Sequence, residues 1–325
     1  MAASSDSLIE ALKAAGEPTR LRILALLRRG DLAVGELVQI LDQSQPRLSH
    51  HLKTLANSGL VERLPEGSWV FYRAMSKGWQ GEVLNTLFDQ LDLTQEEFAA
   101  DASKLRKVRE SRAKSAESYF TNIADQWDEV RAMHFPDDAI EAALLETIGT
   151  GPFKRVIDLG TGTGRMLTLF APFAQEAEGL DLSHQMLTVA RANLAAAGVG
   201  NARVRQGTVT STPFEAQSAD LIIIHQVLHF IEEPGEVLQE VARLLRPQGR
   251  LVVVDFAPHT LEFLRDEHGH RRLGIREQDM SDWANRAGLA LEAPRYFAPP
   301  ESLDQGLGVY IWTASLNSNL KQAAA

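Results

Sequence analysis

Between residues 154 and 256, short runs of β-branched or apolar residues alternate with segments of helical periodicity. Alternation of this kind predicts an α/β domain in which helices cover both faces of a mostly parallel sheet. Such a sheet binds its ligand at the carboxyl ends of the strands. The predicted strands are Arg155 to Leu159, Glu178 to Leu182, Ala202 to Gln206, Leu221 to His225 and Arg250 to Phe256.

A glycine-rich turn, DLGTGTG, follows the first predicted strand, and a helix is expected from Met166 onward. Its glycines permit tight turning and let backbone amides approach a ligand closely. Asp181 ends the next strand, 23 residues after Asp158, where its carboxylate can accept hydrogen bonds from ribose hydroxyls. A dinucleotide site would need a further glycine where Arg165 stands. The glycines of the turn are Gly160, Gly162 and Gly164.

The first 92 residues predict an α+β structure, with short helices followed by a hairpin. Helical patterns cover residues 8–15, 18–27 and 34–41, and a fourth helix begins after Ser44, which is placed to cap it. Strands are expected at residues 61–64 and 69–73, around a turn near Gly67. Helices followed by a hairpin in this order predict a winged helix-turn-helix.

The fourth helix is amphipathic. Leu48, Leu52 and Leu55 recur at helical spacing and should face the core, whereas a polar and basic face points outward. The segment of residues 1–78 holds ten Lys or Arg and eight Asp or Glu, a net charge of +2, so the total of −10 leaves −12 for the remainder of the chain. Only the first segment therefore has a charge balance suited to phosphates.

Residues 83–91 carry an apolar stripe on a further helix, for which two interpretations stay open: packing within the domain, or a dimer interface. Residues 93–135 are predicted to form a helical linker that is also a candidate lid of the ligand pocket, and the aromatic residues of Ser118-Tyr-Phe120 and Trp127 precede the sheet. The basic run at residues 104–109 is interpreted as a solvated face of this linker. The predicted domains are thus 1–92 and 136–315, with a flexible tail over 316–325.

Several segments in order resemble the class I S-adenosylmethionine (SAM)-dependent methyltransferases: DLGTGTG, GLDLSHQMLTVAR at 179–191, SADLIIIHQVLHFIEEP at 218–234 and LLRPQGRLVVVD at 244–255. The resemblance implies a Rossmann-like fold that binds SAM or S-adenosylhomocysteine (SAH). Thr208 stands where similar proteins commonly carry an aspartate. The residues that the resemblance assigns to this ligand are Asp158, Gly160, Gly162, Gly164, Asp181, Met186, Thr208, Val209 and His225.

Residues 5–92 resemble the ArsR family of winged-helix regulators, and SQPRLSHHLKTLANSGLVERL matches the recognition helix and wing of that family. The resemblance implies a homodimer that binds palindromic DNA and represses transcription until an effector binds. The alternative is that this helix contacts other proteins and does not bind DNA. The residues expected to meet bases or phosphates are Ser44, Gln45, Arg47, Ser49, His50, Lys53 and, in the wing, Gly67.

The chain contains no cysteine, which removes thiolate nucleophiles, disulfides and thiolate metal sites. It also lacks the histidines and cysteines with which many ArsR regulators bind metals. His259, His268 and His270 are close in sequence, but on a helix the last two would point about 200° apart. We therefore expect no metal. With no apolar run of membrane-spanning length and no secretory signal, we expect a cytoplasmic protein without a membrane partner.

Two functions remain open. In the first, the methyltransferase-like domain senses SAM or SAH and controls DNA binding. Chains that join these two domains resemble regulators of SAM, SAH and methionine metabolism. In the second, the chain is an active small-molecule methyltransferase, with His225, His229 or His259 as a possible base. The absence of cysteine excludes C5-cytosine methylation and thiol-based arsenite methylation. The sequence after the fourth strand, His225-Gln-Val-Leu, also lacks the loop of amino-directed DNA methylation.

Overall fold

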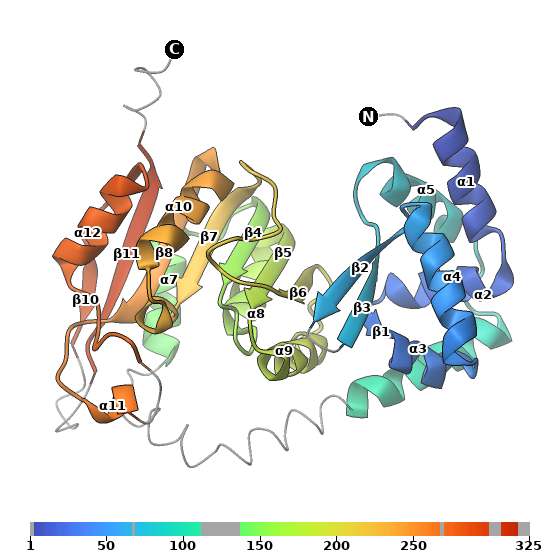
Figure 1. The fold of residues 1–325 in the computed structure, drawn as a ribbon, viewed down its shortest axis with the longest axis horizontal. Helices are drawn as coiled ribbons and strands as arrows, with labels where there is room; N and C mark the ends of the chain where they lie inside the picture. Colours follow the sequence, from blue (N-terminus) through green and yellow to red (C-terminus); the bar gives the residue numbers. More distant parts are fainter. Residues whose placement is uncertain (1–2, 67–68, 112–136, 267–269, 299–306, 318–325) are drawn as a thin grey trace. The chain divides into compact units, whose positions relative to one another are not determined.

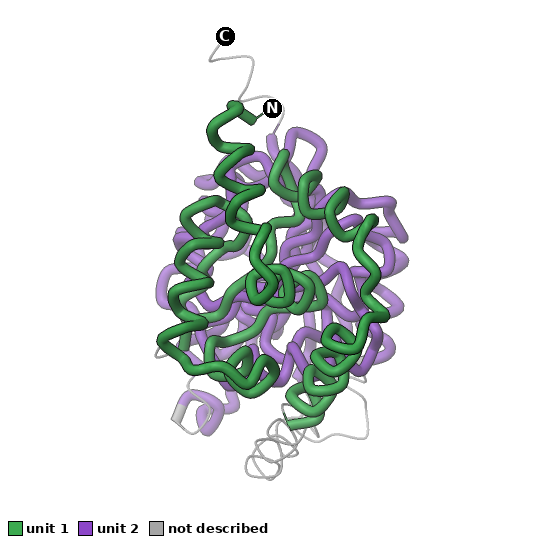
Figure 2. Tube along the Cα trace, turned by 90° about the vertical axis from the view of Figure 1, so that its right-hand side faces the viewer, with its two compact units in different colours: residues 1–115 green, residues 116–325 purple. Residues whose placement is uncertain are grey.

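The computed structural model describes residues 3–66, 69–111, 137–266, 270–298 and 307–317. The chain divides into two compact units, Met1–Ser115 and Ala116–Ala325, which are coloured separately in Figure 2. Gly67, Ser118-Tyr-Phe120, Trp127 and His268 lie outside the described residues. Each unit has its own sheet and its own core (Figure 1).

The first unit is a winged helix-turn-helix, as the sequence predicts. Pro18 begins the second helix, where its missing N–H costs nothing, and the Glu17 carboxylate caps that helix by accepting from the Arg20 backbone N–H at 2.8 Å. A short strand, β1, pairs with the hairpin to make an antiparallel sheet of order β1-β3-β2. The elements are α1 (Ser5–Ala15), α2 (Pro18–Leu27), β1 (Leu32–Ala33), α3 (Val34–Leu41), α4 (Gln45–Asn57), β2 (Val61–Glu66), β3 (Trp69–Ala74) and α5 (Gly78–Asp89).

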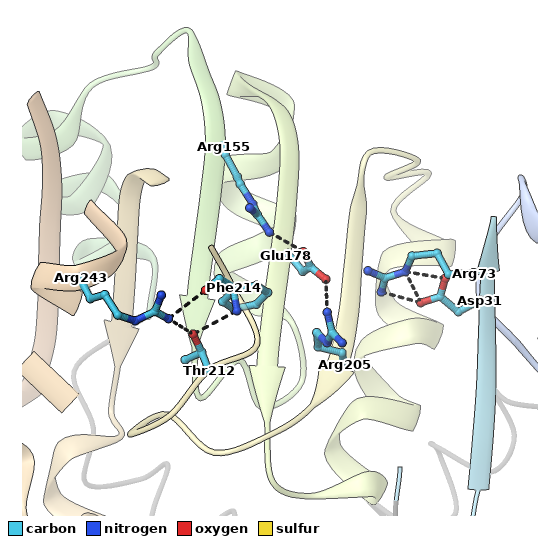
Figure 3. Close-up of polar contacts among 8 residues, drawn as sticks. All are labelled: Asp31, Arg73, Arg155, Glu178, Arg205, Thr212, Phe214 and Arg243. Atoms are coloured by element: carbon cyan, nitrogen blue, oxygen red, sulfur yellow. Dashed lines mark hydrogen bonds and ion pairs between the residues drawn. The ribbon is translucent and has the colours of Figure 1, made fainter. Parts of the chain in front are cut away.

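A buried ion pair holds the wing hairpin to the helical part of this unit. Arg73 on β3 donates from Nη2 to Asp31 Oδ2 at 2.8 Å and from Nε to Asp31 Oδ1 at 3.1 Å (Figure 3). Their side chains are 9% and 5% exposed. Breaking such a pair on one side leaves a buried charge without its partner, at a cost of about 3–5 kcal/mol.

The first unit extends beyond the hairpin and α5. Residues 96–111 are helical, and Leu105 and Val108 on this segment are buried in the same core as α1 to α5. The basic run at residues 104–109 therefore lies on a helix with one buried face, because its two apolar residues are three positions apart. The described helix of the predicted linker, residues 96–111, belongs to the first unit.

The second unit contains one sheet in the order β10-β11-β8-β7-β4-β5-β6, with β9 paired to β11. Five neighbouring strands are mutually parallel, in the sheet order β8-β7-β4-β5-β6. Strand β11 runs antiparallel to β8. The five predicted strands are confirmed, and the three short or antiparallel ones at the end are additional. The strands are β4 (Phe153–Leu159), β5 (Ala174–Asp181), β6 (Ala202–Gln206), β7 (Ala219–His225), β8 (Leu245–Phe256), β9 (Leu289–Leu291), β10 (Arg295–Phe297) and β11 (Val309–Leu316).

Helices cover both faces of this sheet, because neighbouring residues of each strand point to opposite sides. Val156 packs with one set of helices, and Ile157 with the other. The first set is α7 (Asp137–Ile148), α8 (Arg165–Phe170) and α9 (His184–Ala196); the second is α10 (Pro234–Leu244) and α12 (Glu277–Arg286). The short elements η1 (Ala171–Phe173), η2 (Leu228–Phe230) and α11 (Phe263–Asp266) complete the unit.

Ion pairs and polar contacts also connect neighbouring strands and fix the segment after β6. Glu178 on β5 accepts from Arg155 on β4 at 2.9 Å and lies 3.9 Å from Arg205 on β6 (Figure 3). Arg243 on α10 donates to the Phe214 carbonyl at 2.9 Å. The Thr212 backbone N–H donates to Glu240 at 2.8 Å. These contacts hold residues 207–218 against α10, close to the end of β6.

Candidate functional site

The site forms where the strand order reverses. β4 lies between β5 and β7, so the helices that follow these strands diverge to opposite faces and leave a crevice at the carboxyl end of β4. The glycine turn occupies this position, between Leu159 at the end of β4 and Arg165 at the start of α8. Arg165, which replaces the glycine of dinucleotide sites, donates instead to Glu141 on α7.

The glycines of the turn are required by backbone conformation. Gly160, Gly162 and Gly164 all have left-handed φ angles, of 77°, 51° and 79°. At Gly160 an added Cβ would lie 2.3 Å from the Cγ2 of Val227, so this position also excludes a side chain by contact. A Cβ added at Gly162 would meet no atom within 4 Å, which leaves the Cα side of that part of the turn open to a ligand.

Asp181 joins the glycine turn to the end of β5. Its Oδ2 accepts from the Gly162 backbone N–H at 2.9 Å, and its Oδ1 accepts from the Ser183 backbone N–H at 2.8 Å. Both carboxylate oxygens are thereby oriented at the strand end, where the sequence predicts a ribose contact. Ser183 also caps α9, since its hydroxyl accepts from the Met186 backbone N–H at 3.3 Å.

Asp158 is a buried carboxyl group with one unsatisfied oxygen. Its exposed fraction is 1%. Its Oδ2 accepts from the Thr161 hydroxyl at 2.6 Å, and its Oδ1 has no hydrogen-bond partner within the described residues. Burial raises the pKa of Asp158 from 3.8 to about 7, against the lowering effect of Thr161 and with a further raising effect of nearby Asp181. A cationic group placed here would convert this carboxyl to its ionised form.

The residues assigned to adenine have different surroundings. Met186 is half-buried on the first turn of α9, and Thr208 is half-buried after β6, where its hydroxyl lies 3.0 Å from that of Thr210. The side chain of Val209 is 6% exposed and packs in the core, so only its backbone is available to a ligand. Leu182, which sequence reasoning did not select, is 65% exposed directly after Asp181.

The three candidate bases have different surroundings. His225 ends β7 and is half-buried. His229 on η2 is 2% exposed, and its Nδ1 lies 2.7 Å from Oδ1 of the buried Asp255. His259 is half-buried, and burial lowers its pKa. Asp255 was not selected from the sequence, although its place at the end of the run LVVVD was a usable signal.

The polar face of α4 is exposed, as predicted. Leu48, Leu52 and Leu55 are 0% exposed, which fixes the rotation of the helix. Ser44 is the N-cap residue, but its hydroxyl accepts no capping hydrogen bond, contrary to expectation. Pro46 removes one of the two N–H groups that an N-cap side chain normally binds, and the N–H of Arg47 remains. The exposed residues are Ser44, Gln45, Arg47, Ser49, His50 and Lys53.

The helix over residues 96–111 contacts the turn that precedes this face. Lys104 binds the carboxylate of Asp42, the left-handed residue that ends α3. Asp101 accepts two hydrogen bonds from Arg22 on α2, at 2.7 and 2.6 Å, and its side chain is 4% exposed. The helix-turn-helix is therefore fixed to the segment through which the chain leaves the first unit.

The two interpretations of the apolar stripe on α5 can now be compared. Leu84 and Phe88 are 1% and 6% exposed and belong to the core of the first unit, which supports packing within the domain. Among the described residues of the first unit, large apolar side chains are exposed on α1, where Leu8, Ile9 and Leu12 are 37%, 48% and 50% exposed, and on β3, where Trp69 is 48% exposed.

Within the part of the chain that the structure describes, no group of three or more His, Cys, Asp or Glu side chains is arranged to hold a metal ion. His270 is buried beside His229, with ring centroids 4.2 Å apart. Among the described helices, none has the length and apolar character needed to cross a membrane.

A winged helix-turn-helix followed by a Rossmann-like domain with this strand order defines a two-domain chain of the regulator and methyltransferase classes. Family models agree: residues 17–63 match the model described as bacterial regulatory protein, arsR family, and residues 157–253 match the model described as methyltransferase domain. The chain therefore joins an ArsR-family helix-turn-helix to a methyltransferase domain.

Curated relatives match the second unit. The chain is 35% identical over 150 residues to the uncharacterized methyltransferase YcgJ of Bacillus subtilis, which covers 43% of this chain and 57% of that protein. It is 32% identical over 122 residues to the ubiquinone/menaquinone biosynthesis C-methyltransferase UbiE of Vibrio cholerae, which covers 36% of this chain and 47% of that protein. The chain thus spans about half the length of these relatives. The crystal structure of YcgJ is similar with a TM-score of 0.49 and 20% identity, covering 55% of this chain and 98% of that one.

Proposed function

We propose that this protein is a DNA-binding transcriptional regulator whose methyltransferase-type unit binds SAM or SAH and thereby changes affinity for a palindromic operator. By its resemblance to regulators of this kind, we propose that it represses genes of SAM and methionine metabolism in the cytoplasm. The observation that carries the proposal is the helix over residues 96–111. This helix contacts the turn before α4 and leads along the chain toward the ligand-binding unit.

The polar face of α4 supports the DNA-binding part. Six polar side chains are exposed there, and Arg47 and Lys53 carry positive charge. Arg47 and Gln45 have the donor groups that read base edges, whereas Lys53 and Ser44 suit phosphates. The free hydroxyl of Ser44 is thus available to a phosphate. We propose that Gly67 in the wing contacts a neighbouring groove.

The carboxyl ends of β4 and β5 support the ligand-binding part. SAM carries a cationic sulfonium and an ammonium group, and the buried, half-partnered carboxyl of Asp158 suits a positive charge. We propose that Asp181 holds the ribose, that the glycine turn admits the methionine part at Gly162, and that Thr208, Val209 and His225 border the site. Leu182 and Met186 offer apolar surface to adenine. These residues fit SAM and SAH alike, and SAM supplies an electrophilic methyl group when bound.

Coupling requires that the ligand bind the DNA-competent and DNA-incompetent states with different affinity. Lys104 and Asp101 supply two contacts through which a movement of the helix over residues 96–111 would reach α3, α2 and the following turn. The pair of Asp101 with Arg22 is buried on the Asp101 side, so this helix moves together with α2 and not independently.

We also propose that the regulator is a homodimer, since a palindrome presents two equal half-sites. The apolar side chains of Leu8, Ile9 and Leu12 on α1 are the exposed surface that supports this proposal.

The test is a DNA-binding titration with the full chain. A palindromic duplex is first obtained by selection from a random pool, and its binding is then measured by fluorescence anisotropy without ligand, with SAM and with SAH. We expect one ligand to change the Kd at least tenfold, equivalent to about 1.4 kcal/mol of coupling free energy. Equal affinities in the three titrations would contradict the sensor function and leave DNA binding intact.

Two variants separate the parts of this function. Asp181→Asn removes the negative charge at the strand end with little change of shape, and it should abolish the ligand effect while ligand-free DNA binding is retained. Lys104→Met keeps the apolar stem but removes the contact with Asp42. It should leave SAM binding unchanged in calorimetry and reduce only the coupling. Loss of ligand-free DNA binding in Asp181→Asn would indicate that the variant is unfolded. A thermal melt would detect that unfolding.

A further inference from the structure

A buried pair of side chains lies at the carboxyl ends of β7 and β8. Asp255 is the second-to-last residue of β8 and is 0% exposed, and His229 on η2 is 2% exposed. Oδ2 of Asp255 accepts from the Leu228 backbone N–H at 2.9 Å, and Oδ1 accepts from the Phe256 backbone N–H at 2.8 Å. Oδ1 also lies 2.7 Å from Nδ1 of His229. The carboxylate thus acts only as an acceptor.

This arrangement fixes the tautomer of His229. Because Asp255 accepts, Nδ1 of His229 must donate, and the lone pair of the neutral ring is left on Nε2. Within the described part of the chain, the side-chain hydrogen bond of the His229 ring is the one from Nδ1 to Asp255, and Nε2 has none. A carboxylate that holds Nδ1 and leaves Nε2 available is the arrangement of a general base.

The pair lies beside the ligand-binding crevice. Gln226, the first residue after β7, adopts a left-handed φ of 56°, and its backbone N–H donates to the Val254 carbonyl at 2.7 Å. This conformation turns the chain so that Val227 packs directly against Gly160 of the glycine turn. His229 follows two residues later. Strained backbone of this kind is concentrated at functional sites.

Aromatic rings surround the pair. The ring centroids of Phe230 and Phe256 lie 4.1 and 4.9 Å from that of His229. Phe230 is 44% exposed, although the Asp255–His229 pair beside it is buried. An aromatic ring stacked on Phe230 would therefore replace solvent on apolar surface and bring a hydroxyl substituent near the imidazole.

His259 adds a donor to the same cluster. Its Nδ1 accepts from the Leu261 backbone N–H at 3.3 Å, so its Nε2 carries the proton. This Nε2 is buried and has no hydrogen-bond partner within the described residues. Burial is the main cause that lowers the pKa of His259, and the nearby His229 lowers it further. The ring therefore stays a neutral donor. The cluster thus offers one acceptor and one donor.

We propose that His229, Phe230, Asp255 and His259 form an acceptor site for a small aromatic hydroxyl compound, in which Nε2 of His229 removes the hydroxyl proton. The proton moves to Nε2 while the O–H electron pair remains on oxygen, and Asp255 stabilises the resulting imidazolium as a positioning residue. His259 donates to a second oxygen of the compound. This site gives the methyltransferase domain an activity of its own, and it rests on the proposed binding of SAM.

The chemistry balances without a further reagent. SAM, when bound, supplies the methyl group: an O–C bond forms as the C–S bond breaks, and the electron pair of that bond stays on sulfur, giving SAH. The imidazolium of His229 then releases its proton to water. The products are the methyl ether, SAH and one proton.

The experiment uses 4-nitrophenol as the probe, because its anion absorbs visible light and its neutral form does not. The full chain, without SAM, is titrated with the probe in a buffer mildly acidic enough that free probe is mostly neutral. We expect the nitrophenolate band to appear on binding. His229→Asn should remove this band, although Asn can still donate to Asp255 from the position of Nδ1. His184→Asn, which removes an imidazole from α9 of the same unit, is the matched control and should retain the band.

A second readout adds SAM. We expect wild-type protein to form 4-nitroanisole and SAH, and His229→Asn to form them at least about 100-fold more slowly, the usual contribution of a general base. A wild-type protein that shows no nitrophenolate band, or a His229→Asn variant that shows the same band, would overturn the proposal and make the pair structural. SAM binding by calorimetry is measured on each variant. Retained SAM binding without methyl transfer would refute this inference alone, whereas lost SAM binding in wild type would refute the proposed function.

Discussion

We expect the affinity for SAM, a cationic ligand, to depend on pH through Asp158, and the pKa of this carboxyl gives the size of the effect. In the free protein its carboxyl is 1% exposed and has a pKa of about 7. If SAM binds the ionised form, affinity follows the ionised fraction of the free protein. For a pKa of about 7 this fraction falls about tenfold between pH 8 and pH 6, which equals about 1.4 kcal/mol. We therefore expect SAM to bind about tenfold more weakly at pH 6.

Folding stability should change in the opposite direction. The pKa of Asp158 in the folded protein lies above its ordinary value of 3.8, so the folded state holds this proton more tightly than the unfolded state does. The contribution of Asp158 to the free energy of unfolding is then largest at low pH and is lost as pH rises through about 7. Between pH 8 and pH 6 the ligand-free protein should gain about 1.4 kcal/mol from this group.

The measurements compare wild type with Asp158→Asn. Calorimetric titrations with SAM at the two pH values give the change in affinity, and urea unfolding without ligand gives the change in stability. The difference between the two proteins cancels the titration of every other group. The Asn variant should be more stable than wild type at pH 8 and should bind SAM weakly at both values. A wild-type affinity for SAM that does not fall toward pH 6, or a stability difference that does not depend on pH, would refute the reasoning.

Further predictions concern the other elements of the two units. Arg47→Ala should weaken binding of the selected duplex by about 1–3 kcal/mol and relax specificity at one base position, measured by anisotropy on a set of single-base variants; an equal loss on all sequences would place Arg47 on phosphate instead. Gly160→Ala should abolish SAM binding in calorimetry, because its Cβ would meet Val227 at 2.3 Å, and Gly160→Ala combined with Val227→Ala should not fully restore it, since φ stays left-handed. Full restoration would show that contact alone matters. Leu12→Asp should shift the protein toward monomer in analytical ultracentrifugation, and an unchanged mass would exclude α1 as the dimer interface.

The sequence alone predicted the parts of this protein that depend on local periodicity. The spacing of Leu48, Leu52 and Leu55 defined the buried side of α4, and all three are fully buried. The alternation of apolar runs with helical segments identified five strands of the second sheet. Both patterns are readable because a helix or a strand repeats its orientation every few residues, whatever its partners are. The roles of the ligand and DNA residues remain proposals.

Contacts between distant residues could not be obtained in this way. The charges at residues 104–109 indicated a solvated face, and Arg106, Lys107 and Arg109 are exposed as predicted. The charges did not indicate that Leu105 and Val108 on the opposite face pack into the core of the first unit. Ser44 looked like a capping residue, and the conformation of the turn leaves its hydroxyl without that bond.

What the sequence determined by itself is the division into a winged helix-turn-helix and a Rossmann-like domain, together with the glycine turn and the strand-end acids. The tertiary structure alone decided their chemical state. Burial gave Asp158 its raised pKa, and the pairing of β7 with β8 brought Asp255 to His229, 26 residues away in sequence. The physical reason is that desolvation and hydrogen bonding depend on which groups surround a side chain in space, and the local pattern of a sequence carries little of that information.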